Sequence, residues 1–487
     1  MAITVERKKW ILYKHTCDYE LIKAVALDVK NTCKTYLSDA ERHRMQERLA
    51  KLNLYKTRNP AETPLDSINH RINTLEYWMF GYEYKDRDQK RFMFSPLGNL
   101  FLKYIDDNER LCMIFISMLF ALQFQHPASG TDKEFQLYPF RLIFKLLFDE
   151  RLGGKLYNNE VEYLVVFIKN MSSKEYEKLV VEILNLREKT DLEMSTLFKK
   201  DEHTYVNAVY EWEYYTLSLL SEVGVFEKHL GHKICELFHP RKEKSKSPPT
   251  KRIATRGYIT IPTAQAEFIS DMITSYHYDA SPITLNDAER MTEDAIKEIY
   301  SFYPKLLLDG IGETSRLSEL LELPKHIGEY AINPENNAPY LFERVLTDGF
   351  NMFYNVDATQ KGGAGHTDIE CFYRTKKKKF AVESKSTANK LTEINVGRLR
   401  EHREEIGGEY TIVVTPRYVP AAKRDIVGAP VVIILASTFA EYLYNHIFNE
   451  IRDVDYADFD DIIINNLGQD ISLLISDLTI KKFSAVG

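Results

Sequence analysis

The sequence has few cysteines, no cysteine pair of the metal-binding type and no long apolar run. The five cysteines in 487 residues are odd in number and scattered, at Cys17, Cys33, Cys112, Cys235 and Cys371. This argues against a disulfide scaffold and a four-cysteine zinc site, and is typical of a reducing compartment. The longest apolar stretch, Leu111–Leu122, is shorter than the roughly 20 residues of a membrane-spanning helix. The start, MAITVERKKWILYK, lacks the apolar centre of a secretion signal, so we expect a soluble, cytoplasmic protein without a membrane partner.

The chain also lacks an excess of positive charge. Its formal net charge is -7, which excludes a uniformly basic surface but leaves room for local basic patches that contact phosphate. A 44% hydrophobic share and a 28% charged share are ordinary for folded protein. The length accommodates about three domains at roughly 150 residues each.

The first 200 residues combine a hairpin pattern with helical patterns. Residues 74–105 alternate apolar and polar positions around a charged turn at 85–90, and then enter an amphipathic helix through 95–98. A β-hairpin beside short helices is typical of a winged-helix-like DNA-recognition domain, which we place at 1–125; a hairpin that serves only in packing is the alternative. Residues 126–200 predict a helical domain, because LYPFRLIFKLLFDERLGG has an apolar stripe at helical spacing that ends at a Gly pair.

Residues 201–275 predict a second winged-helix-like DNA-binding domain with a basic segment. The segment has seven basic residues against one acid, and these are Arg241, Lys242, Lys244, Lys246, Lys251, Arg252 and Arg256. Ser and Pro at 245–249 prevent a regular helix. In a chain of net negative charge, we expect this loop to contact DNA phosphates; a solvated linker is the alternative.

The rest of the chain predicts an α/β domain. Residues 276–329 are expected to link the two halves. Within 330–487, the runs FAVESK, YTIVVTP and PVVIILAS are typical of strands, and 391–406 and 437–451 are typical of helices. The pattern predicts a central mixed sheet, and the fold class of the chain is therefore α+β multidomain.

The residues best suited to chemistry lie in 362–390, GGAGHTDIECFYRTKKKKFAVESKSTANK. We interpret 368–373 as a strand, 375–379 as a basic turn and 380–385 as the second strand of a hairpin. Since side chains alternate along a strand, Glu383 and Lys385 share one face, as do Asp368 and Glu370. A turn centred near 376 and 377 places Asp368 opposite Lys385 and Glu370 opposite Glu383, so that carboxylates and ammonium converge.

That convergence suits phosphodiester hydrolysis. Two carboxylates form a hard oxygen site for Mg²⁺, which lowers the pKa of a bound water, and a nearby Lys can orient that water or stabilise developing charge. An ordinary surface hairpin with cross-strand ion pairs is the alternative. The surrounding sequence favours the nuclease interpretation over an ordinary surface hairpin. The same E-x-K spacing at Glu6-Arg7-Lys8 has no strand around it, whereas Glu383-Ser384-Lys385 ends an apolar strand.

Asp368 and Glu383-Ser384-Lys385 resemble the PD-(D/E)xK nuclease motif, with Thr367 in place of the usual Pro. Members of that superfamily often carry an acidic residue on the helix before the first core strand, and Glu343 in the segment Pro339–Gly349 matches this place. The order of elements, with FMFSPLGNLFLKY and YPFRLIFKLLFDERLGGKL, resembles type IIS restriction and nicking endonucleases of the AlwI/BstNBI kind.

This resemblance implies a recognition half and a restriction-endonuclease-like catalytic half. It implies a Mg²⁺-dependent, sequence-specific endonuclease that cuts double-stranded DNA to one side of a short asymmetric site. The implied metal ligands are Asp368 and Glu383, with Glu370 as a further candidate. Lys385 would position the water, and Glu343 would assist as an outer metal or water ligand. Arg398 and His402, on the helix after the E-x-K strand, are expected at the backbone of the cleaved strand or at the surface.

Three alternatives stay open at this point: a strand-specific nicking endonuclease, a modification-dependent nuclease and an inert DNA-binding regulator. One catalytic centre cuts one strand, so a double-strand break requires a transient homodimer on DNA or a second catalytic subunit. Gly153-Gly154-Lys155 lacks the rest of a Walker A loop, so ATP-driven translocation is not expected. The chain has no D/N-P-P-Y/F/W element, so the methylase of a restriction-modification pair would be another chain.

Overall fold

A computed structural model describes residues 6–10, 17–32, 37–55, 64–86, 89–128, 133–239, 249–285, 292–312, 316–333, 339–361, 365–451 and 453–483. The chain forms two compact units, Met1–Thr284 with Phe302–Ile311 and Leu285–Ser301 with Gly312–Gly487. Within the described ranges, none of the helices combines the length and the apolar character needed to cross a membrane. The predicted mixture of helices and strands is confirmed.

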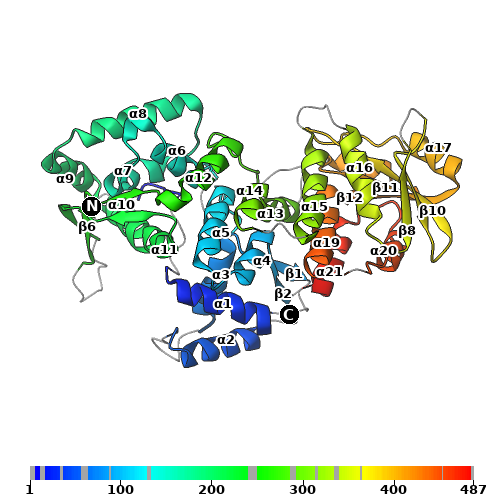
Figure 1. The fold of residues 1–487 in the computed structure, drawn as a ribbon, viewed down its shortest axis with the longest axis horizontal. Coiled ribbons are helices and arrows are strands. Elements are labelled where there is room, and N and C mark those ends of the chain that lie inside the picture. Colours follow the sequence, from blue (N-terminus) through cyan, green and yellow to red (C-terminus); the bar gives the residue numbers. More distant parts are fainter. Residues whose placement is uncertain are drawn as a thin grey trace. The chain divides into compact units, whose positions relative to one another are not determined.

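The N-terminal unit is mainly helical (Figure 1). Its α-helices are α1 (Tyr19–Thr32), α2 (Asp39–Lys51), α3 (Pro64–Tyr77), α4 (Pro96–Lys103), α5 (Asn108–Ala121), α6 (Pro139–Leu147), α7 (Asn158–Tyr163), α8 (Ser173–Arg187), α9 (Asp191–Lys200), α10 (Glu202–Tyr210), α11 (Ser218–Glu222), α12 (Thr263–Ser275) and α14 (Lys305–Gly310). Its strands are β1 (Gly81–Asp86), β2 (Gln89–Phe94), β3 (Leu156–Tyr157), β4 (Glu227–His229), β5 (Lys233–Phe238), β6 (Lys251–Thr255) and β7 (Tyr258–Thr260).

The hairpin predicted within residues 74–105 is present. β1 and β2 pair antiparallel from Gly81 opposite Phe94 to Asp86 opposite Gln89. The chain then enters α4 because the Ser95 side chain accepts a hydrogen bond from the Gly98 amide and caps the helix. β5 and β6 form another antiparallel pair, and β3 and β4 both pair antiparallel with β7.

The C-terminal unit contains a five-stranded sheet in the order β12-β11-β10-β9-β8. Its strands are β8 (Val356–Gln360), β9 (Ile369–Tyr373), β10 (Lys378–Ser384), β11 (Gly408–Thr415) and β12 (Val431–Leu435). β8, β9 and β10 are antiparallel neighbours, whereas β10, β11 and β12 are parallel. The mixed sheet predicted for 330–487 is therefore confirmed. The helices of the unit are α13 (Thr292–Tyr300), α15 (Arg316–Ile332), α16 (Pro339–Phe350), α17 (Val396–Ile406), α18 (Pro420–Asp425), α19 (Ala436–Phe448), α20 (Ala457–Asn465) and α21 (Ser472–Phe483).

The two faces of this sheet contribute to separate apolar cores. One face packs against α15, α16, α19, α20 and α21, and Val382 of β10 points to it. Side chains of the opposite face, such as Val413 of β11, pack with Leu399 of α17 and Ala422 of α18. Because side chains alternate along β10, Glu383 points away from Val382 and toward the α17 face. The sheet thus directs the E-x-K glutamate to the side covered by a helix that carries Arg398 and His402.

Candidate active site

The β9–β10 hairpin brings Asp368 and Glu383 to adjacent strands, in a register that differs from the expected one. Tyr373 pairs with Lys378 and Ile369 with Val382, so Glu370 lies opposite Ala381. The expected pairing of Glu370 with Glu383 was wrong by two residues. A slip of two residues keeps every side chain on its face, so Asp368 and Glu383 still share one side of the sheet.

Asp368 lies just before β9 and is bound to the other strand of the hairpin. One carboxylate oxygen, Oδ2, accepts hydrogen bonds from the Ser384 amide at 2.7 Å and from the Ser384 hydroxyl at 2.9 Å. Thr367, at the place of the motif's usual Pro, is buried and donates to the Val382 carbonyl at 3.2 Å. Burial and then the negative charge of Glu383 raise the pKa of Asp368, and Lys385 and Ser384 oppose this only in part. Asp368 is therefore an oriented carboxylate beside a second carboxylate.

Glu383 and Lys385 form an ion pair at the end of β10. The Lys385 Nζ lies 3.1 Å from Oε2 of Glu383, and the Lys385 and Glu383 side chains are 33% and 1% exposed. The Lys385 amide donates to the Val414 carbonyl at 2.8 Å, which extends the pairing of β10 with β11 to this residue. The ammonium group therefore lies at the surface next to a buried carboxylate.

Arg398 is at the surface, as one of its two expected positions required, whereas His402 is buried. His402 is 3% exposed, and its Nδ1 lies 2.7 Å from Oε1 of Glu383. The exposed Arg398 donates from Nε to Nε2 of His402 at 3.3 Å. His402 therefore lies behind the Glu383 carboxylate, and Arg398 is the member of the pair that reaches solvent.

The other two candidate acids lie apart from this pair. Lys379 and Lys361 approach the two oxygens of Glu370 at 2.7 and 2.8 Å and hold its pKa below the usual value. Glu343, on α16 as expected, accepts a hydrogen bond from Gln360 at 2.9 Å. Gln360 is opposite Ile369 in the sheet, one residue from Asp368.

The donor set of the hairpin fits a hard divalent cation. Among the described residues, no three His, Cys, Asp or Glu side chains are grouped to hold a metal by themselves. Mg²⁺ does not need such a group, because it usually keeps several waters and binds through one or two carboxylates together with substrate phosphates. Asp368 and Glu383 supply two carboxylates, and a cation bound by both would relieve the repulsion from Glu383 that adds to burial in raising the pKa of Asp368.

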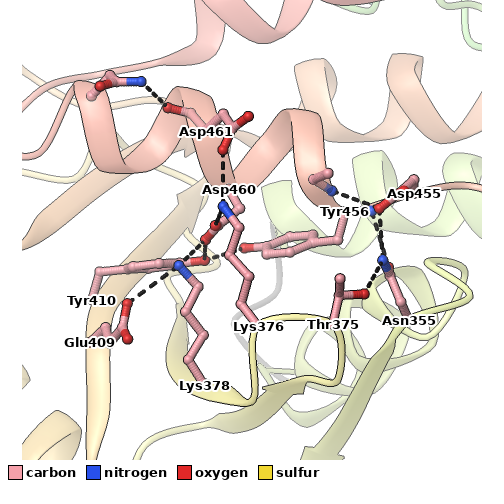
Figure 2. Close-up of polar contacts among 12 residues, drawn as sticks. Asn355, Thr375, Lys376, Lys378, Glu409, Tyr410, Asp455, Tyr456, Asp460 and Asp461 are labelled. Atoms are coloured by element: carbon pink, nitrogen blue, oxygen red, sulfur yellow. Dashed lines mark hydrogen bonds and ion pairs between the residues drawn. The ribbon is translucent and has the colours of Figure 1, made fainter.

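The opposite end of the hairpin carries a second charged cluster, for which the sequence predicted only a basic turn. Lys376 and Lys378 both reach the carboxylate of Asp460 on α20, at 2.8 and 2.5 Å (Figure 2). The Tyr410 hydroxyl donates to the same carboxylate at 2.9 Å. Burial raises the pKa of Asp460, but these hydrogen bonds outweigh it and the net pKa is below the usual value. The turn is thus anchored to the helix by a buried ion pair.

The basic segment of the N-terminal unit is described only at its end. Arg241, Lys242, Lys244 and Lys246 lie outside the described residues. Arg256 follows β6, and its Nε donates to Asp191 at 3.0 Å. This ion pair joins the end of the segment to α9.

Lys251 and Arg252 begin β6 and have different surroundings. Lys251 pairs with Glu236 at 2.9 Å. The guanidinium of Arg252 lies 3.7 Å from the centre of the Tyr210 ring, a cation–π contact, and its Nη1 donates to the Lys251 carbonyl at 2.9 Å.

Sequence comparisons identify the class of protein. Residues 5–276 match the family model described as "Type II restriction endonuclease HgaI, N-terminal domain". The type II restriction enzyme HgaI of Avibacterium volantium is 46% identical over 476 residues, which cover 97% of this chain and 97% of that enzyme. These matches define a type II restriction endonuclease. The chain belongs to the HgaI family of these enzymes.

Solved structures show weaker likeness. The BpuJ1 endonuclease binding domain, solved with pyrene- and phenanthrene-modified DNA, is 15% identical with a TM-score of 0.36 and covers 61% of this chain and 95% of its own. Restriction endonuclease FokI is 10% identical with a TM-score of 0.26 and covers 95% and 99%. Because both scores are below 0.5, the family assignment depends on the sequence matches alone.

Proposed function

We propose that the chain is a Mg²⁺-dependent type IIS endonuclease that cuts double-stranded DNA to one side of a short asymmetric site. The observation that carries this is the ion pair of Lys385 with Glu383, one strand away from Asp368. Two carboxylates and an ammonium on adjoining strands of a mixed sheet are the functional groups of the PD-(D/E)xK motif.

Each residue of the cluster has a role that its contacts suggest. Asp368 and Glu383 hold the cation, which when bound lowers the pKa of a coordinated water and neutralises phosphate charge. Ser384 orients Asp368 through two hydrogen bonds to one oxygen. Lys385 is accessible to solvent, so its ammonium can orient the attacking water or stabilise charge on the phosphoryl oxygens. Glu343 acts as an outer ligand through water.

The N-terminal unit supplies DNA recognition in this proposal. Winged-helix-like domains at 1–125 and 201–275, separated by the helical domain 126–200, present hairpins and a basic segment to the duplex. Arg398, at the surface of α17, contacts the backbone of the cleaved strand. Because the described residues contain one Asp368–Glu383–Lys385 cluster, we further propose that a transient homodimer on DNA, or a second subunit, completes a double-strand break.

The test is cleavage of supercoiled plasmid and phage DNA with Mg²⁺ or EDTA, by wild type, Lys385→Ala and Lys379→Ala. Lys379 is a matched control because it lies on the same strand and also pairs with a glutamate, at 2.7 Å. We expect discrete Mg²⁺-dependent fragments, a loss of roughly 10²- to 10³-fold in rate for Lys385→Ala and little change for Lys379→Ala.

Other outcomes contradict the proposal in distinct ways. Open circles without linear product indicate a strand-specific nicking enzyme. Cleavage only of methylated DNA indicates a modification-dependent nuclease. Intact DNA binding without cleavage of any substrate indicates an inert DNA-binding regulator.

A further inference from the structure

The Glu383 carboxylate is fixed at both of its oxygens. Oε2 receives the Lys385 ammonium at 3.1 Å, and Oε1 receives His402 at 2.7 Å. With 1% of Glu383 and 3% of His402 exposed, solvent water is not a ready substitute for the imidazole. Lys385 therefore binds the oxygen of Glu383 that is nearer to solvent, and His402 binds the oxygen that is nearer to the protein interior.

The contact with Arg398 determines which imidazole nitrogen carries the proton. A guanidinium can only donate, so Nε2 of His402 must accept the hydrogen bond from Arg398. The proton of the neutral ring is then on Nδ1, where it is donated to Oε1 of Glu383. Arg398 and His402 are four residues apart on α17, so one helical turn sets the geometry of the whole chain of hydrogen bonds.

We propose that His402 is a positioning residue, which holds Glu383 in the orientation needed to bind a divalent cation and which Arg398 keeps in the required tautomer. This inference rests on the proposed function. A ligating carboxylate commonly needs a hydrogen-bond partner on its outer side, because an unconstrained carboxylate can rotate away from the cation. His402 supplies that partner from a helix outside the hairpin.

The test compares three substitutions of His402 in the full-length chain. Asn places its amide nitrogen where Nδ1 was and keeps the bond to Glu383. Gln places its amide near the position of Nε2, toward Arg398, and Leu removes both bonds. The readouts are the Kd for Mg²⁺ by titration calorimetry, the Mg²⁺ concentration that gives half-maximal cleavage, and the melting temperature.

His446 provides a matched control. It is also a buried histidine on a helix of the C-terminal unit, 2% exposed, with Nδ1 bound to the Tyr442 carbonyl of its own helix at 2.9 Å. Its substitution by Leu should lower the melting temperature without changing the Mg²⁺ dependence. It therefore separates a general loss of packing from a specific loss at the carboxylate.

We expect His402→Leu to raise the Kd for Mg²⁺ and the half-maximal concentration by about 10- to 100-fold. His402→Asn should recover most of this loss, and His402→Gln should recover little. An unchanged Kd in a folded His402→Leu protein, or an equal shift in His446→Leu, overturns the positioning role alone. A wild type that neither binds Mg²⁺ nor cleaves DNA overturns the proposed function, and this inference with it.

Discussion

Replacing Asp460 by Asn should weaken the attachment of the turn end of the β9–β10 hairpin to α20. Asp460 is fully buried, and its partner Lys378 is 6% exposed on the side chain, so the substitution leaves an ammonium group in a poorly solvated position. Glu409, at 3.3 Å and 55% exposed, is the remaining counter-charge near Lys378. Removing one partner of a buried ion pair typically costs about 3–5 kcal/mol.

Hydrogen exchange of the β10 amides in the intact protein measures this effect locally. A cost of about 3–5 kcal/mol in opening free energy corresponds to exchange that is faster by roughly 100- to 4,000-fold. A local probe is needed because a chain of two compact units does not unfold in one step. Amides of the β1–β2 hairpin, in the other unit, serve as the internal reference.

Two further results follow from the same network. Asp460→Asn combined with Lys378→Met removes both charges and should recover much of the lost protection, because an apolar pair of similar size can replace a buried ion pair at little cost. The pKa of Asp460 is depressed in the folded state, so its contribution is present above the usual carboxyl value of about 4 and is lost as the pH falls through the folded pKa. The difference between wild type and Asp460→Asn should therefore shrink in acid. Unchanged exchange in Asp460→Asn at neutral pH would refute the reasoning.

Three other predictions concern the candidate active site and the binding of DNA. Asp368→Asn should raise the melting temperature measured without Mg²⁺ at neutral pH. Burial and the charge of Glu383 raise the pKa of Asp368, which means that its ionised form opposes folding. An unchanged or lower melting temperature in a calorimetric scan contradicts this. Glu370→Gln should keep cleavage within a few-fold of wild type, since Glu370 already has two lysine partners, and a loss as large as that of Glu383→Gln in the same assay would make it a ligand. Lys251→Ala with Arg252→Ala should reduce the slope of log K against log salt by about 1.8, at roughly 0.9 per phosphate contact, and an unchanged slope in a filter-binding series leaves the segment as a linker.

The sequence predicted four of the five strands of the C-terminal sheet and the members of the cluster, because both depend on local pattern. β10, β11 and β12 lie on the expected runs, but β10 begins at Lys378, within the expected turn, and β8 was not predicted. E-x-K at the end of an apolar run indicated Glu383 and Lys385. The register could not be derived in this way. The turn is centred between Thr375 and Lys376, one position earlier than expected. Lys377 adopts a φ of 50°, a left-handed conformation that the presence of a lysine does not predict.

The missed features all depend on contacts between distant segments. Lys376 and Lys378 look like surface residues until Asp460, more than 80 positions later, is brought beside them. His402 likewise looks like part of a charged helix face, and its bond to Glu383 exists only once α17 packs on β10. Periodicity indicates that α17 is a helix, but the face it presents to the sheet is a property of the tertiary fold.

The balance of charges differs between the two ends of the β9–β10 hairpin, and this difference distinguishes a structural ion pair from a candidate metal site. At the turn, the buried carboxylate of Asp460 has two ammonium partners and a hydroxyl donor, and its pKa is lowered. At the other end, Asp368 and Glu383 have one ammonium between them, that of Lys385, and burial together with the charge of Glu383 raises the pKa of Asp368. Buried carboxylates that outnumber their cationic partners oppose folding unless a cation joins them, and this supports the proposal of a metal site at this end of the hairpin. The turn end of the hairpin is fastened to α20, and the excess of carboxylates at the other end is the feature on which the proposed Mg²⁺ site depends.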